Sequence, residues 1–120
     1  GFLSAHQMAI TQLAIQYCDA LVENDTLAGN FFPDFDFDAS ANTVFDSDGK
    51  AAIINPLIEK FIGTNLNTQP ADNDVNTELD ALIELLTSCS SDTSCTSERS
   101  KTVVKASCAA VLGSAITLVQ

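Results

Sequence analysis

Apolar residues recur at intervals of three and four positions in several segments of this 120-residue chain, and this spacing constrains the fold more than any other feature. In the first segment they are Ala9, Ile10, Leu13, Ala14, Tyr17, Cys18, Leu21 and Val22. Such spacing places apolar side chains on one face of an α-helix. Similar stripes follow in residues 75–86 and 104–119. The chain has no tryptophan and one tyrosine, so its core must be mostly aliphatic, which suits packed helices. We therefore predict one all-α domain spanning residues 1–120.

The first and last helices have capping residues at their starts. Ser4 as N-cap and Gln7 at N3 form a capping box for the first helix. That helix should end near Asn24, where asparagine, aspartate and glycine accumulate. Ser97 follows a polar loop and is placed to cap the last helix.

Two more helices are expected between these. Residues 47–62 have a helical pattern but contain Asn55-Pro56, a good N-cap and N1 pair. Because proline is disfavoured in a helix interior, either one kinked helix spans this segment or a short turn precedes a helix over residues 56–62. A third helix then ends near Ser88. Four helices joined by loops of different lengths predict a four-helix bundle.

Residues 25–47 show no sustained helical period. Phe35 and Phe37 alternate with aspartates, as in a strand, but Pro33 and the lack of a partner strand argue against a sheet. We predict a long ordered loop whose phenylalanines enter the core while the aspartates face water.

The four cysteines form an even set without metal-binding spacing, which favours disulfides. Of the three possible connectivities, one joins near neighbours, Cys89 and Cys95, and leaves Cys18 to pair with Cys108. The second bridge would staple the first helix to the last. Disulfides indicate an oxidising compartment, so we predict a secreted, periplasmic or cell-surface protein. The alternative is that Cys18 and Cys108 are free buried thiols.

The stretch "DFDFDASANTVFDSDGK", residues 34–50, raises the question of calcium. An EF-hand aligned on Gly49 fails, because Val44 stands at the first ligand position and the final glutamate is missing. An irregular calcium site stays open, and its candidate ligands are Asp34, Asp36, Asp38, Asp46 and Asp48. The alternative is that Asp46 or Asp48 caps the following helix. No other cofactor is indicated.

The formal net charge is −11, and residues 1–49 contain no lysine or arginine. Nucleic acids and anionic lipid surfaces bind cationic proteins, so we expect neither as a partner. Residues 106–119 are uncharged, but they are fewer than the roughly 20 residues that span a bilayer. We expect them to form a buried helix without membrane insertion.

Catalytic groups are not indicated. The single histidine, His6, has no partner that the sequence identifies, and no cysteine is left over for it to activate. No catalytic triad order, nucleophile elbow, phosphate-binding loop or zinc-protease motif occurs. We therefore predict that the protein is not an enzyme.

Four stretches carry a resemblance over nearly the whole chain: "SAHQMAITQLAIQYC", "FFPDFDF", "INPLIEK" and "KTVVKASCAAVLGSA". In this order they resemble a helical module of large secreted proteins of Gram-negative, often marine, bacteria, where the module lies near laminin-G-like, lectin-type domains. The resemblance implies an extracellular location and a non-catalytic accessory role. The resemblance does not identify any catalytic or binding residues in this chain.

These observations favour a non-catalytic secreted or cell-surface module that acts in adhesion or assembly through contacts with other protein domains or with copies of itself. One alternative is a self-assembling subunit of an extracellular filament or surface layer. Another is a small carrier that encloses an apolar ligand, as secreted helical binding proteins do.

Overall fold

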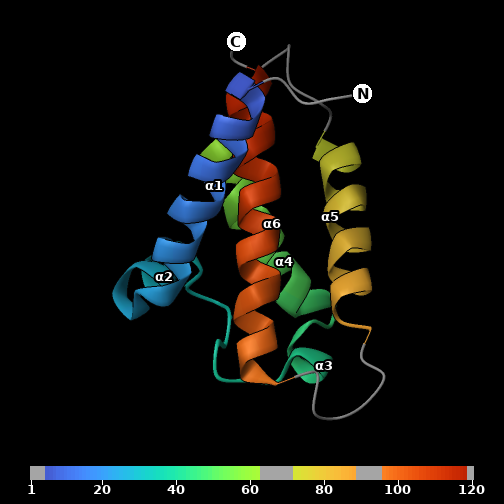
Figure 1. Cartoon of the computed structure of the whole chain (residues 1–120). Helices are drawn as coiled ribbons and strands as arrows, with labels where there is room; N and C mark the ends of the chain where they lie inside the picture. Colours follow the sequence, from blue (N-terminus) through green and yellow to red (C-terminus); the bar gives the residue numbers. More distant parts are fainter. Residues whose placement is uncertain (1–4, 63–71, 89–95, 119–120) are drawn as a thin grey trace.

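The computed structural model describes residues 5–62, 72–88 and 96–118, and within these ranges every regular element is helical (Figure 1). The α-helices are α1 (Ala5–Glu23), α2 (Asp25–Phe31), α3 (Ala41–Val44), α4 (Ser47–Leu57), α5 (Asp72–Leu86) and α6 (Ser97–Leu118). A π-helix, Ile58–Ile62, continues α4. The predicted all-α class is confirmed.

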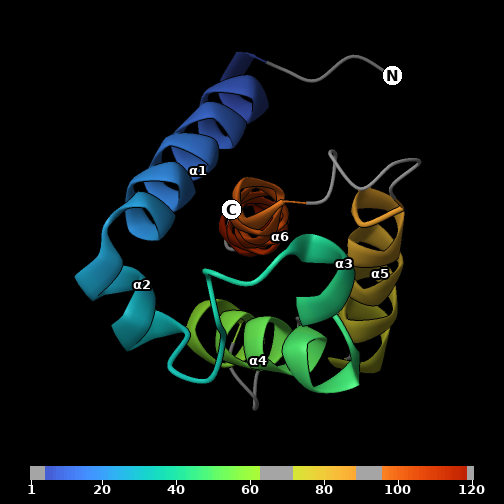
Figure 2. The ribbon, with the colours of Figure 1, turned by 90° about the horizontal axis from the view of Figure 1, so that it is seen from below.

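Helix α6 lies at the centre of the fold. Viewed along its axis, it has α1 and α2 on one side, α4 below it and α3 and α5 on the other side (Figure 2). Its buried residues recur at intervals of three and four positions and form one broad face: Ser100, Val103, Val104, Ser107, Cys108 and Val111. The predicted four-helix bundle is not confirmed, since α6 contacts α1, α3, α4, α5 and the π-helix.

The disulfide between Cys18 and Cys108 joins α1 to the central helix. The two Cα atoms lie 5.8 Å apart, and both side chains are fully buried. One turn before Cys108, Lys105 forms ion pairs with Asp19, at 2.8 Å, and with Glu23. The predicted staple between the first and last helices is thus confirmed. The second predicted pair, Cys89 with Cys95, lies outside the described residues and stays a prediction.

The predicted loop after α1 is wrong in part, because α2 and α3 lie within it. Asn24 is the N-cap of α2, and its side-chain Oδ1 accepts a hydrogen bond from the Leu27 N–H at 3.0 Å. Its buried residues are only Ala28 and Phe31, too few to produce a visible helical period. Helix α3 is a single turn that Thr43 supports by donating from its hydroxyl to the Ser40 carbonyl.

The connection between α2 and α3 follows the sequence prediction. Phe32 and Phe35 are buried, and Phe37 packs against the core from a half-buried position. The aspartates between and after these phenylalanines, Asp34, Asp36 and Asp38, are exposed. The alternation of phenylalanine and aspartate therefore separates core from solvent without forming a strand.

Asn55 does not cap a helix, contrary to the prediction. Helix α4 begins at Ser47, so Asn55 and Pro56 lie inside it, and the helix continues past the proline. Pro56 has no N–H to donate to the preceding turn, and the chain responds by widening into the π-helix Ile58–Ile62. Of the two sequence alternatives, the single helix through Pro56 is correct, and it continues as a π-helix from Ile58.

The other predicted caps have different outcomes. Ser97 is the first residue of α6, so the capping position belongs to Thr96, whose carbonyl accepts the first helical hydrogen bond from the Ser100 N–H. The Ser97 prediction is thus wrong by one residue, a common uncertainty at helix ends. Ser4 lies outside the described residues, and so does the side chain of Gln7. None of the helices in the described ranges is both long and apolar enough to cross a bilayer.

A pair of substitutions on α5 tests how this helix faces the core. Ile83 is fully buried, whereas Leu85, two residues along the same helix, is 71% exposed. Ile83→Ala is expected to lower the free energy of unfolding by about 2–4 kcal/mol, because it leaves a cavity. Leu85→Ala should change it by less than about 0.5 kcal/mol. Urea denaturation measures both, and equal losses would contradict this orientation of α5.

Candidate functional site

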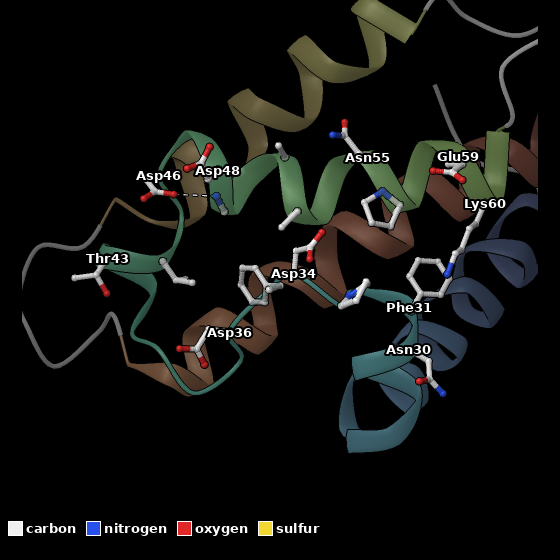
Figure 3. A pocket seen from close by; sticks show the side chains of 17 residues that line it. Asn30, Phe31, Asp34, Asp36, Thr43, Asp46, Asp48, Asn55, Glu59 and Lys60 are labelled. Atoms are coloured by element: carbon white, nitrogen blue, oxygen red, sulfur yellow. Dashed lines mark hydrogen bonds between the residues drawn. The ribbon is translucent and has the colours of Figure 1, made fainter.

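A groove of about 740 Å³ separates the connection after α2 from α4 and the π-helix (Figure 3). One side is formed by residues 30–36, and the other by residues 43–60. Its volume lies within the range of ordinary ligand sites, about 300–1,000 Å³. We call it the acidic groove, for the side chains described next.

The walls of the acidic groove include apolar side chains that belong to, or pack against, the core. Phe31 and Phe35 are buried, and the half-buried Val44 and Pro56 line the groove beside them. Phe35 stacks against Phe45 with ring centroids 5.2 Å apart. Because these rings are held by the core, the groove wall is preformed.

Five carboxylates line the acidic groove: Asp34, Asp36, Asp46, Asp48 and Glu59. Two of them accept local backbone hydrogen bonds. Asp46 Oδ1 accepts from the Gly49 N–H at 2.8 Å, and Asp36 Oδ1 accepts from the Asp38 N–H at 3.0 Å. The Asp34, Asp48 and Glu59 carboxylates form no hydrogen bond or ion pair with other described residues, and all three are exposed. They are charges that the fold does not neutralise.

Lys60 is the only one of the chain's five basic residues that lines the acidic groove. Its Nζ lies 4.4 Å from the centroid of the Phe31 ring, within reach of a cation–π interaction. The π-helix brings Lys60 and Glu59 to this end of the groove. The groove therefore carries an excess of negative charge.

Lys50, Arg99 and Lys105 form contacts elsewhere. Lys50 directly follows Gly49 but pairs with α5, through Asp80 at 3.2 Å and through Glu84. The hydrogen bond with Glu84 is the main reason that the pKa of Lys50 is raised, so this lysine stays charged. Arg99 donates from Nε to the Leu86 carbonyl at 2.9 Å. These contacts join helices to one another and leave Lys60 as the basic side chain in the acidic groove.

The structure brings four of the five candidate calcium ligands to one groove but spreads them along it. Asp34, Asp36, Asp46 and Asp48 line the acidic groove, whereas Asp38 lines a separate cavity that also includes Lys101. Within residues 5–62, 72–88 and 96–118, no three carboxylate, histidine or cysteine side chains gather closely enough to hold a metal ion. Calcium binding stays a prediction. The alternative role is confirmed for Asp46, which is the N-cap of α4.

Sequence reasoning missed Phe31, Glu59 and Lys60 as parts of this site. Glu59 and Lys60 are far along the chain from Asp34 and Asp36, and only the packing of α4 against the connection brings them to the same groove. The signal that does point to the groove is the alternation of phenylalanine and aspartate in residues 34–38. The side chain of His6 lies outside the described part of the structure. The absence of catalytic activity stays a prediction.

Comparison with known proteins adds no assignment: no protein-family model, no curated protein and no solved structure matches this chain.

Proposed function

We propose that this domain is a non-catalytic contact module of a secreted or cell-surface protein, and that it acts in adhesion or assembly through the acidic groove. The observation that carries this proposal is the presence of exposed carboxylates without internal partners on a preformed, partly apolar surface. Uncompensated like charges on one surface oppose the compact state. The Asp34, Asp48 and Glu59 carboxylates form no described hydrogen bond or ion pair. A partner that neutralises them accounts for their placement.

The disulfide supports the extracellular part of the proposal. Cys18 and Cys108 are paired inside the core, and such bonds persist in oxidising compartments. The same location is implied by the resemblance to helical modules of large secreted bacterial proteins, and we propose that this domain is one of them. An apolar-ligand carrier is not favoured, because an apolar molecule in this groove would desolvate carboxylates without pairing them.

Site-directed photo-crosslinking tests the proposal. A benzoylphenylalanine replaces Ala51, which lines the acidic groove, or Glu78, which is exposed on α5 away from it. Each variant is illuminated with the secreted and surface proteins of its source cell, and adducts are identified by mass spectrometry. We expect an adduct from position 51 that position 78 does not form.

The identity of the crosslinked protein distinguishes binding to a different protein from self-assembly. A second protein supports adhesion or assembly with a partner, and a second copy of this chain supports the self-assembling subunit. If position 51 gives no adduct beyond those of position 78, the groove is not a contact surface and the proposal is wrong.

A further inference from the structure

We propose that the acidic groove binds a short, extended, cationic segment of a partner protein, in which lysine or arginine side chains are separated by apolar ones. This inference rests on the proposed function and specifies the chemistry of the partner. It follows from the length of the groove, the distribution of its charges and the apolar side chains between them.

The length of the groove fits a segment of about six residues. Asp46 and Asp48 lie at the start of α4, Glu59 and Lys60 lie beyond its end, and Asp34 lies between the two ends on the opposite side (Figure 3). The twelve-residue step from Ser47 to Glu59 corresponds to about 18 Å at 1.5 Å per helical residue. An extended chain covers this distance in five or six residues, at about 3.3 Å each.

The distribution of the carboxylates favours several cationic groups on one chain over a single metal ion. Calcium needs six to eight oxygens around one point. In the described residues no such cluster exists, and the carboxylates instead follow the groove from one end to the other. Asp34, Asp48 and Glu59, which have no described partner, are therefore separate positions for separate cations.

The apolar lining fits the rest of such a segment. Lysine and arginine have aliphatic stems that pack on apolar surfaces while their charged ends reach carboxylates. Phe35, Pro33 and Pro56 provide this surface between the charged positions. The Lys60 ammonium over the Phe31 ring shows that this surface already holds a cation against an aromatic face.

Peptide binding measured by fluorescence anisotropy tests the inference. The probe is a fluorescein-labelled hexapeptide, Lys-Val-Lys-Ala-Lys-Val, and the control peptide has glutamate in place of each lysine. We expect the lysine peptide to bind at low salt, the glutamate peptide not to bind, and added sodium chloride to weaken binding through screening.

Two matched double variants test whether the peptide binds in the acidic groove. Asp34→Asn with Asp48→Asn removes two unpaired groove carboxylates, and Glu78→Gln with Glu98→Gln removes two exposed carboxylates outside it. Loss of two exposed charge contacts is expected to raise the Kd by about tenfold. The control pair should change the Kd by less than about twofold, the effect of net charge alone. Circular dichroism and Tm verify that both variants are folded.

Three results would overturn the inference: no binding of the lysine peptide, equal binding of the glutamate peptide, or equal losses of peptide affinity in the two double variants.

Calcium chloride and spermidine are titrated separately. If calcium binds the folded domain and the peptide does not, the groove is a metal site. If spermidine binds and the peptide does not, the groove recognises small polyamines. If the lysine peptide does not bind but position 51 forms a crosslinked adduct, the inference of a cationic partner segment is wrong. The proposed function as a contact module is then still supported.

Discussion

Replacing both bridged cysteines, Cys18→Ala with Cys108→Ala, is expected to lower the free energy of unfolding by about 4–5 kcal/mol. The two cysteines are 90 residues apart in sequence, so the bond closes most of the chain into a loop and strongly restricts the unfolded state. The loss approaches the whole stability of a typical small domain, about 5–15 kcal/mol. Thermal unfolding followed by circular dichroism should show a Tm lowered by more than about 15 °C.

Thiol titration of the same variant is the control. If Cys89 and Cys95 are paired as predicted, the unfolded double variant has no free thiol before reduction and two after it. A Tm unchanged in the double variant would mean that the bond contributes no stability. Free thiols before reduction would show that the Cys89 and Cys95 prediction is wrong.

Gly49→Ala is expected to lower the free energy of unfolding by about 2–3 kcal/mol, because the added methyl group has no room. A Cβ at this position would lie 1.7 Å from the carbonyl oxygen of Val44 and 3.3 Å from Oδ1 of Asp46. The contact with Val44 is to backbone, so the start of α4 would have to move. That movement would also displace the Asp46 side chain from the Gly49 N–H, and the helix would lose its cap.

Gly29→Ala is the matched control for this substitution. Gly29 lies within α2, and a Cβ there would meet no atom within 4 Å. Because glycine is a poor helix former, this change should be neutral or stabilise the domain by up to about 1 kcal/mol. Urea denaturation of both variants measures the difference. A Gly49→Ala protein as stable as the Gly29→Ala protein would contradict the close approach of α4 to Val44.

The sequence predicts the long helices because each has a sustained apolar stripe. Of the eight apolar residues predicted to form the stripe of α1, Ile10, Ala14, Cys18, Leu21 and Val22 are buried. Ala9, Leu13 and Tyr17 are exposed, so the buried face is narrower than predicted. The short helices α2 and α3 are not predicted, because seven and four residues are too few to show a helical period of apolar residues. Asn24 does carry a local signal, since asparagine is a favoured N-cap, but a single capping residue does not establish a helix.

Pro56 illustrates how tertiary context overrides a local preference. Taken alone, Asn55-Pro56 is a good helix start. In the fold, the cap at Asp46 has already begun the helix, and buried side chains on both sides of the proline, Ile53 and Leu57, hold it in line. The burial of Ile53 and Leu57 outweighs the backbone hydrogen bond that Pro56 cannot donate. The π-helix that follows accommodates the change in backbone geometry.

The candidate site is predictable only in its chemistry. The five aspartates of residues 34–48 are visible in the sequence, and so is the alternation in residues 34–38 that turns three of them toward water. Their arrangement along a groove depends on the contact between this connection and α4, which no local pattern encodes. For the same reason the sequence cannot distinguish one metal site from a line of separate charges.

The position of the disulfide has a mechanical consequence for a domain pulled through its chain. Tension entering along α1 passes at Cys18 directly to Cys108 and bypasses the 90-residue span between them. That span would otherwise extend to about 300 Å. All residues that line the acidic groove lie within it. A partner seated there is thus held on a part of the molecule that carries no tension, even when the ends of α1 and α6 beyond the bridge have been drawn out straight.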